Sequence, residues 1–263
     1  MSNMVKNRCP LCNGKYPVIS KGTITRSFRG VAYEFFAKEC NHCKVGFFDP
    51  NASFELRKEY HDLGYFIAQN GEQRDYLDYG EPNHREVKEN WGVLLLMWLQ
   101  RLLLREPKSL LFLGPGLGYE MKAAIDRGLN VAAIEISEYA TEQIKELYGM
   151  GCYVYSDRAE LFQGMKHDGV VCWDSFLQLD DPVGFLRMVK ENCTPDVRLI
   201  LHLADYDCYK DDLTHPYWSP FQHCFHFNRV TLKSVLKMGG FKATKFPPSP
   251  QEGEILAWCK LLE

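Results

Sequence analysis

The stretch LLFLGPGLGYE, residues 110–120, decides the fold. Four apolar residues run directly into three glycines at alternate positions, Gly114, Gly116 and Gly118. A short apolar run that ends in a turn is typical of a buried strand, and glycines at such a turn let the polar atoms of a ligand approach the backbone. The stretch therefore predicts a nucleotide-like ligand at the carboxyl edge of a parallel sheet.

Strands and helices alternate after this stretch, which indicates an α/β fold with a mostly parallel sheet. The tail differs, because a short Pro-rich turn joins its last two strands and so makes the final strand antiparallel. The expected strands are 110–113, 130–136, 152–155, 169–173, 198–203, 241–246 and 254–262, and the expected helices are 119–128, 137–149, 181–193 and 231–240.

The glycine spacing distinguishes between two nucleotide ligands. A dinucleotide fingerprint needs G-x-G-x-x-G, but here the third glycine comes one residue early and Tyr119 occupies the fingerprint position. Glu135, at the end of the next strand, is placed to accept two hydrogen bonds from ribose hydroxyls. The acidic residue suits both a dinucleotide and a nucleotide-like ligand without a pyrophosphate. The glycine spacing favours the ligand without a pyrophosphate.

At these residues the chain resembles the class I S-adenosylmethionine-dependent methyltransferases, over residues 106–263. GPGLG resembles the glycine loop of that family, GCYVYSDRAEL the segment in which Asp157 would face the adenine amino group, and CWDSFLQLDDP the fourth-strand motif. The resemblance implies a Rossmann-like sheet and S-adenosylmethionine as cofactor. The cofactor-binding residues that it implies are Gly114, Gly116, Gly118, Glu135, Ile136, Asp157, Arg158, Trp173 and Asp174.

Two positions depart from the family pattern. Phe112 stands where an acid often precedes the first glycine, and Leu177 and Gln178 stand where the fourth-strand motif often ends in Glu-His. These departures leave open a catalytically silent, cofactor-binding subunit as an alternative to an enzyme.

The segment HPYWSPFQHCFHFNRVTL, residues 215–232, resembles the family segment that closes over the methyl acceptor. His223 best fits the position of the histidine in that segment, with His226 and Tyr217 behind it. His223 is therefore the candidate catalytic residue, as a base or as a group that orients the acceptor. The alternative is that His223 only packs within a loop.

The cysteines indicate a metal site. Cys9 and Cys12 form one C-x2-C pair and Cys40 and Cys43 another, and two such pairs supply the four thiolates of a structural zinc site. The segment 9–50 resembles the zinc-ribbon leader found before methyltransferase domains in bacterial sugar and surface-polysaccharide enzymes.

Composition places the chain among ordinary globular proteins. Its 263 residues are 46% hydrophobic and 25% charged. The start of the chain does not have the pattern of a signal peptide, and the longest apolar run is too short for a membrane span, so we expect a cytoplasmic protein. Three parts are expected: a zinc ribbon at 1–50, a helical linker or lid at 51–105, and a methyltransferase domain at 106–263.

The resulting hypothesis is methyl transfer to a small-molecule or carbohydrate-type acceptor. The alternative acceptor is RNA, bound by the zinc ribbon. The ribbon has only a modest excess of Lys and Arg over Asp and Glu. The sequence leaves open the acceptor atom and the oligomeric state.

Overall fold

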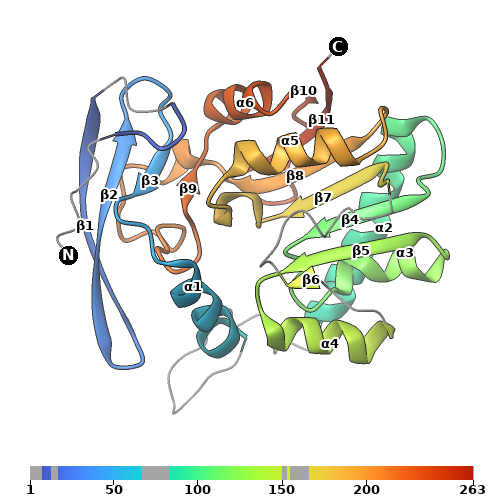
Figure 1. The fold of residues 1–263 in the computed structure, drawn as a ribbon, viewed down its shortest axis with the longest axis horizontal. Helices are drawn as coiled ribbons and strands as arrows, with labels where there is room; N and C mark the ends of the chain where they lie inside the picture. Colours follow the sequence, from blue (N-terminus) through green and yellow to red (C-terminus); the bar gives the residue numbers. More distant parts are fainter. Residues whose placement is uncertain (1–7, 13–16, 67–82, 150–152, 155–165, 263) are drawn as a thin grey trace.

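The computed structural model describes residues 8–12, 17–66, 83–149, 153–154 and 166–262, and within them two β-sheets (Figure 1). The larger sheet has seven strands in the order β10-β11-β8-β7-β4-β5-β6. Its strands are β4 (Ser109–Leu113), β5 (Asn130–Glu135), β6 (Tyr153–Val154), β7 (Gly169–Trp173), β8 (Arg198–Ala204), β10 (Phe241–Lys245) and β11 (Glu254–Leu261).

Strand directions in this sheet match the sequence analysis. Strands β4 to β8 pair in parallel, whereas β11 is antiparallel to both β8 and β10. The predicted α/β fold with an antiparallel last strand is confirmed.

Helices cover both faces of the larger sheet because each strand alternates its apolar side chains between them. Leu111 and Leu113 pack on the face covered by α5 (Pro182–Asn192) and α6 (Arg229–Met238). Leu110 and Phe112 pack on the opposite face, which is covered by three further helices. These are α2 (His84–Leu103), α3 (Lys122–Asp126) and α4 (Glu138–Tyr148).

Local sequence fixes where these helices begin. The Ser137 hydroxyl accepts a hydrogen bond from the Ala140 amide at 3.1 Å, and the Asp181 carboxylate accepts one from the Gly184 amide at 2.8 Å. Both are N-cap bonds that satisfy otherwise unpaired amides of the first turn. Short 3-10 segments stand at Tyr119–Met121, Phe176–Gln178 and Tyr206–Cys208.

The smaller sheet has the order β1-β2-β3-β9 and draws on two distant parts of the chain. Its first three strands are β1 (Val18–Phe28), β2 (Val31–Cys40) and β3 (Gly46–Phe48). The fourth, β9 (Phe225–His226), follows the 215–223 segment and pairs antiparallel with β3. The smaller sheet is therefore completed by residues that lie close in sequence to the predicted catalytic histidine.

Helical segments connect the two sheets. α1 (Phe54–Tyr60) leads directly into a π-helical turn, His61–Tyr65, and α2 begins at His84. At 20 residues α2 is long enough for a membrane span but not apolar enough, and no other helix within the described ranges qualifies.

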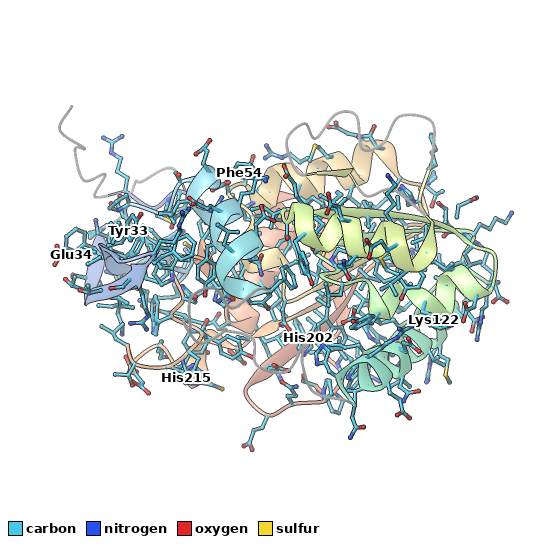
Figure 2. All side chains as sticks on the ribbon, turned by 90° about the horizontal axis from the view of Figure 1, so that it is seen from below. Tyr33, Glu34, Phe54, Lys122, His202 and His215 are labelled. Atoms are coloured by element: carbon cyan, nitrogen blue, oxygen red, sulfur yellow. The ribbon has the colours of Figure 1, made fainter. Side chains whose placement is uncertain are left out.

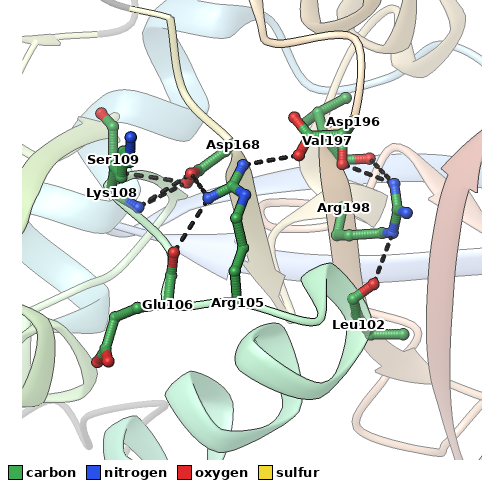
Figure 3. A network of polar contacts seen from close by, with 9 residues as sticks. All are labelled: Leu102, Arg105, Glu106, Lys108, Ser109, Asp168, Asp196, Val197 and Arg198. Carbon is green, nitrogen blue, oxygen red and sulfur yellow. Dashed lines mark hydrogen bonds and ion pairs between the residues drawn. The ribbon is translucent and has the colours of Figure 1, made fainter.

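A polar network ties the end of α2 to the amino ends of the central strands (Figure 3). The buried Asp168 carboxylate accepts hydrogen bonds from the backbone amides of Lys108 and Ser109 and from the Arg105 guanidinium. Arg105 also reaches Asp196, at 2.7 Å. The network lies at the edge of the sheet opposite the predicted ligand.

Candidate active site

A cavity of about 740 Å³ lies at the carboxyl ends of the parallel strands. The arrowheads of β4, β5 and β7 point toward α1 and the smaller sheet (Figure 1). The cavity is lined by the β4 turn, by the ends of β5 and β7, by the 215–223 segment and by residues of α1 and the π-helical turn. Its place is the one at which α/β sheets bind ligands.

The three glycines after β4 all adopt left-handed backbone angles, with φ of +59° at Gly114, +57° at Gly116 and +78° at Gly118. A Cβ on Gly114 would lie 2.5 Å from Cβ of Ser175, and one on Gly118 would lie 2.8 Å from Cγ1 of Ile144. Gly114 and Gly116 line the cavity, whereas Gly118 packs against α4 outside the lining. Left-handed angles and close packing both explain why glycine stands at these positions.

Glu135 ends β5 with its carboxylate held by backbone amides. Oε2 accepts from Gly116 at 2.9 Å, and Oε1 accepts from Ile136 at 2.8 Å and from Ser137 at 3.0 Å. Burial raises the pKa of Glu135 to about 7, although these three hydrogen bonds act in the opposite direction. The glycine turn and the acidic residue therefore form one unit on the cavity wall, together with Ile136.

Trp173 and Asp174, at the end of β7, form the next part of the wall. Asp174 has φ of +55°, an uncommon angle for a residue other than glycine, of the kind that clusters at functional sites. Its carboxylate accepts a hydrogen bond from Nδ1 of His202 at 3.1 Å. Burial opposes ionisation of Asp174, but His202 brings its pKa below the ordinary value.

His202, on β8, lies between two carboxylates. Nε2 is 2.7 Å from Glu254, and the ring stacks on Trp173 at 4.0 Å between centroids. Burial alone would lower its pKa, but Asp174 and Glu254 raise it to about 9. In Figure 2, His202 lies between α3, marked by Lys122, and the smaller sheet, marked by Tyr33 and Glu34.

The trio of Asp174, His202 and Glu254 has the composition of a metal site, but its geometry is that of an ion triad. Each carboxylate contacts a different nitrogen of the same imidazole. A protonated His202 that donates to both carboxylates accounts for the arrangement.

His223 lines the cavity and is buried. Its Nδ1 is 2.8 Å from the backbone carbonyl oxygen of Tyr217, which only accepts hydrogen bonds, so Nδ1 carries the proton. Burial lowers the pKa of His223, which favours the neutral ring with an unprotonated Nε2.

A protein-family model described as "Methyltransferase domain" matches residues 87–245, more than half of the chain. The chain belongs to this methyltransferase family. The match begins within α2 and ends with β10, so it contains the glycine turn, Glu135, the β7 motif and His223.

Solved methyltransferases share the fold. The plantazolicin methyltransferase BpumL in complex with SAH is 12% identical, with 72% of this chain and 94% of that chain covered and a TM-score of 0.51. A S-adenosylmethionine-dependent methyltransferase from Clostridium acetobutylicum ATCC 824 is 12% identical, with 70% and 96% covered and a TM-score of 0.54. The CcbJ methyltransferase from Streptomyces caelestis is 12% identical, with 79% and 99% covered and a TM-score of 0.54. No curated protein matches the chain.

The chain is thus a class I S-adenosylmethionine-dependent methyltransferase. Its cavity wall suits that cofactor, since it offers a glycine turn and a buried carboxylate, with Trp173 and Asp174 beside them. Asp157, expected at the adenine, and Arg158, expected among the cofactor-binding residues, lie outside the described residues.

Residues of α1 and of the π-helical turn form one wall of the cavity, which the sequence did not predict. Arg57 on α1 is buried and pairs with Asp180 at 2.5 Å and with the Cys224 thiol. On the other side, Asp62 accepts a hydrogen bond from the Ser137 hydroxyl at 2.8 Å, beside Glu135. The segment from α1 to the π-helical turn therefore binds both to the region of Asp180 and Cys224 and to the start of α4 beside Glu135.

Part of this wall had a signal in the sequence. The stretch YHDLGY, residues 60–65, has an aromatic residue at each end, and aromatic residues in a helical segment usually indicate packing. Tyr60 does pack in the core of the smaller sheet, whereas Tyr65 lines the cavity. A histidine inside the apolar run RLILHL was the available signal for His202.

The four predicted zinc ligands of this methyltransferase come together. Sγ of Cys9 is 3.6 Å from that of Cys43, Sγ of Cys12 is 3.6 Å from that of Cys40, and all four lie within 4.8 Å of one another. Zn–S bonds of about 2.3 Å in a tetrahedron imply S···S separations of roughly 3.8 Å. The thiols are thus spaced as a structural zinc ion requires.

Proposed function

We propose that the protein methylates a hydroxyl group of a small, carbohydrate-type acceptor, with His223 as the base. The observation that carries this proposal is the tautomer of His223, whose Nδ1 proton is engaged by the Tyr217 carbonyl. A neutral ring with an unprotonated Nε2, on a residue that lines the cavity, is what a general base needs.

The cofactor half of the cavity is assigned to the glycine turn, Glu135, Ile136, Trp173 and Asp174. Glu135 accepts from the ribose hydroxyls in this proposal. S-Adenosylmethionine, when bound, supplies an electrophilic methyl group on a sulfonium. The Asp174–His202–Glu254 triad carries a net charge of about −1 when His202 is protonated, which suits a wall next to a cation.

The acceptor half combines polar and aromatic side chains. Gln178, Gln222 and Gln251 line the cavity, and so does Tyr217, whose hydroxyl donates to Glu254 at 2.9 Å. Such a lining suits a molecule with several hydroxyl groups better than an apolar one. BpumL, which shares the fold, is by its name a plantazolicin methyltransferase.

A zinc ion held by Cys9, Cys12, Cys40 and Cys43 completes the proposal. We assign residues 1–50 to a zinc ribbon, 51–105 to a linker and lid, and 106–263 to the methyltransferase domain. The contacts of Arg57 and Asp62 on opposite sides of the cavity support the lid assignment.

The test is a kinetic comparison of His223→Ala and His223→Gln with the wild type, once labelled methyl donor has revealed an acceptor in fractionated lysate. Loss of the base should lower kcat by about 100-fold or more, with the affinity for S-adenosylhomocysteine unchanged. A residue that only positions the acceptor would instead raise KM. His226→Ala is the neighbouring control. Wild-type kcat and KM in both His223 variants would show that the histidine is structural.

A further inference from the structure

The π-helical turn after α1 places a second histidine on the cavity wall. Helical turns of this kind are rare and are frequent at functional sites. The turn is held in place from outside, because a Cβ on Gly64 would come within 3.2 Å of the rings of Phe28 and Tyr60. His61, its first residue, is buried and lines the cavity.

The hydrogen bonds of His61 leave one nitrogen without a partner. Nδ1 is 2.8 Å from the backbone carbonyl oxygen of Arg57, so Nδ1 carries the proton and Nε2 is an acceptor. Among the residues that the structure describes, none donates to this buried Nε2. A buried polar atom of this kind calls for a partner, and a molecule in the cavity is a source for one.

His61 and His223 repeat the same arrangement. In both, a backbone carbonyl fixes the proton on Nδ1 and leaves Nε2 as an acceptor. Burial, against the hydrogen bond to the Arg57 carbonyl, lowers the pKa of His61 to about 4, and the nearby Arg57 guanidinium acts in the same direction as burial. His61 therefore stays neutral near pH 7 and offers only an acceptor.

We propose that His61 accepts a hydrogen bond from a second hydroxyl group of the methyl acceptor, so that the substrate is a diol or polyol read by two histidines. The proposal rests on the proposed function, since one hydroxyl of the acceptor meets His223 while its neighbour meets His61. Nε2 of a neutral imidazole repels carboxylate and phosphate oxygens, so these groups do not bind there. His61 is a specificity-determining residue. The substrate hydroxyl that it binds keeps its proton.

The test uses pairs of acceptors that differ by one hydroxyl. Catechol and phenol form one pair, and methyl hexopyranosides with their single-deoxy analogues form the others. Transfer of labelled methyl from S-adenosylmethionine is measured for the wild type, His61→Phe and His226→Phe. His226 is the matched control, because it is also buried with Nδ1 engaged and Nε2 unpartnered among the described residues, but it lies on β9 outside the cavity lining.

The wild type should prefer the diol of a productive pair by about tenfold or more in kcat/KM, since a site that binds a hydroxyl disfavours the analogue that lacks it. His61→Phe should lose this preference, because kcat/KM for the diol should fall while kcat/KM for the mono-ol stays nearly unchanged. His226→Phe should retain the preference. The affinity for S-adenosylhomocysteine should be the same in all three proteins. His61→Gln, whose amide oxygen also accepts, should keep part of the preference and serves as the second variant if His61→Phe does not fold.

Retention of the full preference by His61→Phe would overturn the inference. So would methyl transfer to mono-ols but to no diol, which leaves the proposed hydroxyl methylation in place. Transfer only to thiols or amines would overturn both the inference and the proposed function. Label that enters only RNA or protein in fractionated lysate, or that enters nothing although S-adenosylhomocysteine binds, would overturn both the inference and the proposed function.

Discussion

At the scale of single residues, the proposed role of Glu135 at the ribose predicts cofactor binding that depends on pH. Three backbone amides already occupy most of the roughly four lone-pair sites of its carboxylate, so ribose hydroxyls have to displace or share one of them. The carboxylate form accepts hydrogen bonds best, and its pKa is raised to about 7.

We expect the affinity for S-adenosylhomocysteine to fall as the pH drops below 7, by up to about tenfold per pH unit. Glu135→Gln should weaken binding by about 1.5–3 kcal/mol at pH 8, the range for hydrogen bonds to a charged group, and should remove this pH dependence. Calorimetric titration between pH 5.5 and 8 measures both. A wild-type affinity that is flat over this range would contradict the assignment of Glu135.

His202 makes a second pH-dependent contribution, this time to folding. Its pKa of about 9 in the folded protein lies above the ordinary value of 6.5. The stabilisation from the triad is therefore fully present below pH 6.5 and is lost as the pH rises through 9. His202→Ala leaves Glu254 buried without its partner and should cost about 3 kcal/mol at pH 7.

Thermal unfolding of the wild type and His202→Ala between pH 6 and 10 checks this prediction. The wild-type Tm should fall toward pH 9, and the difference between the two proteins should shrink over the same interval. Parallel curves would mean that His202 is not the titrating group.

At the scale of the elements, the network around Asp168 holds α2 against the amino ends of the strands. Asp168→Asn removes the ion pair with Arg105 and one acceptor oxygen from a buried position, and should destabilise the protein by about 2–3 kcal/mol. Asp196→Asn removes a half-exposed partner of the same arginine and should cost less than about 1 kcal/mol.

Urea unfolding measures these two values, and calorimetry with S-adenosylhomocysteine gives the control. Because the network lies at the sheet edge opposite the cavity, both variants should bind the product as the wild type does. A loss of binding in Asp168→Asn at a stability similar to that of Asp196→Asn would contradict a purely structural role.

The regular elements were predictable because their signals are local. The apolar run 110–113, the caps Ser137 and Asp181 and the alternation of strands and helices each occupy a few consecutive residues. The glycine turn and Glu135 were found for the same reason, since their spacing follows from two successive strands.

The missed features depend on residues that are distant in the sequence. His202 gains its role from Glu254, on the last strand, and His61 gains its role from a cavity whose other walls begin at Gly114. The sequence of β1 contains two short β-like runs, in YPVIS and TITRSF, but the strand pairs with β2 along its whole length, with one irregularity between Ser20 and Gly22. No local pattern encodes the pairing of β3 with β9.

At the scale of the whole molecule, the cysteine cluster lies at the ends of strands that lead toward the candidate active site. Cys40 ends β2 and Cys43 precedes β3, which pairs with β9 two residues after His223. Purified protein should carry about one zinc ion per chain, and Cys40→Ser should lose it and be less stable, because a structural zinc site contributes folding free energy directly.

Metal analysis and thermal unfolding measure the two effects. Cys208→Ser is the matched control, because this cysteine is exposed and lies outside the cluster. Freshly prepared, reduced wild-type protein without metal, or a Cys40→Ser variant with full zinc content, would rule out the site.

The pairing of β3 with β9 also has a consequence for synthesis on the ribosome. Gly46 leaves the ribosome roughly 180 residues before its partner His226, which at ~5–20 residues per second is about 10–40 s. During that interval the Gly-Phe-Phe strand has an open, apolar edge of the kind that pairs with other chains. Nascent chains that stall before residue 226 should therefore aggregate more readily than chains that stall after it.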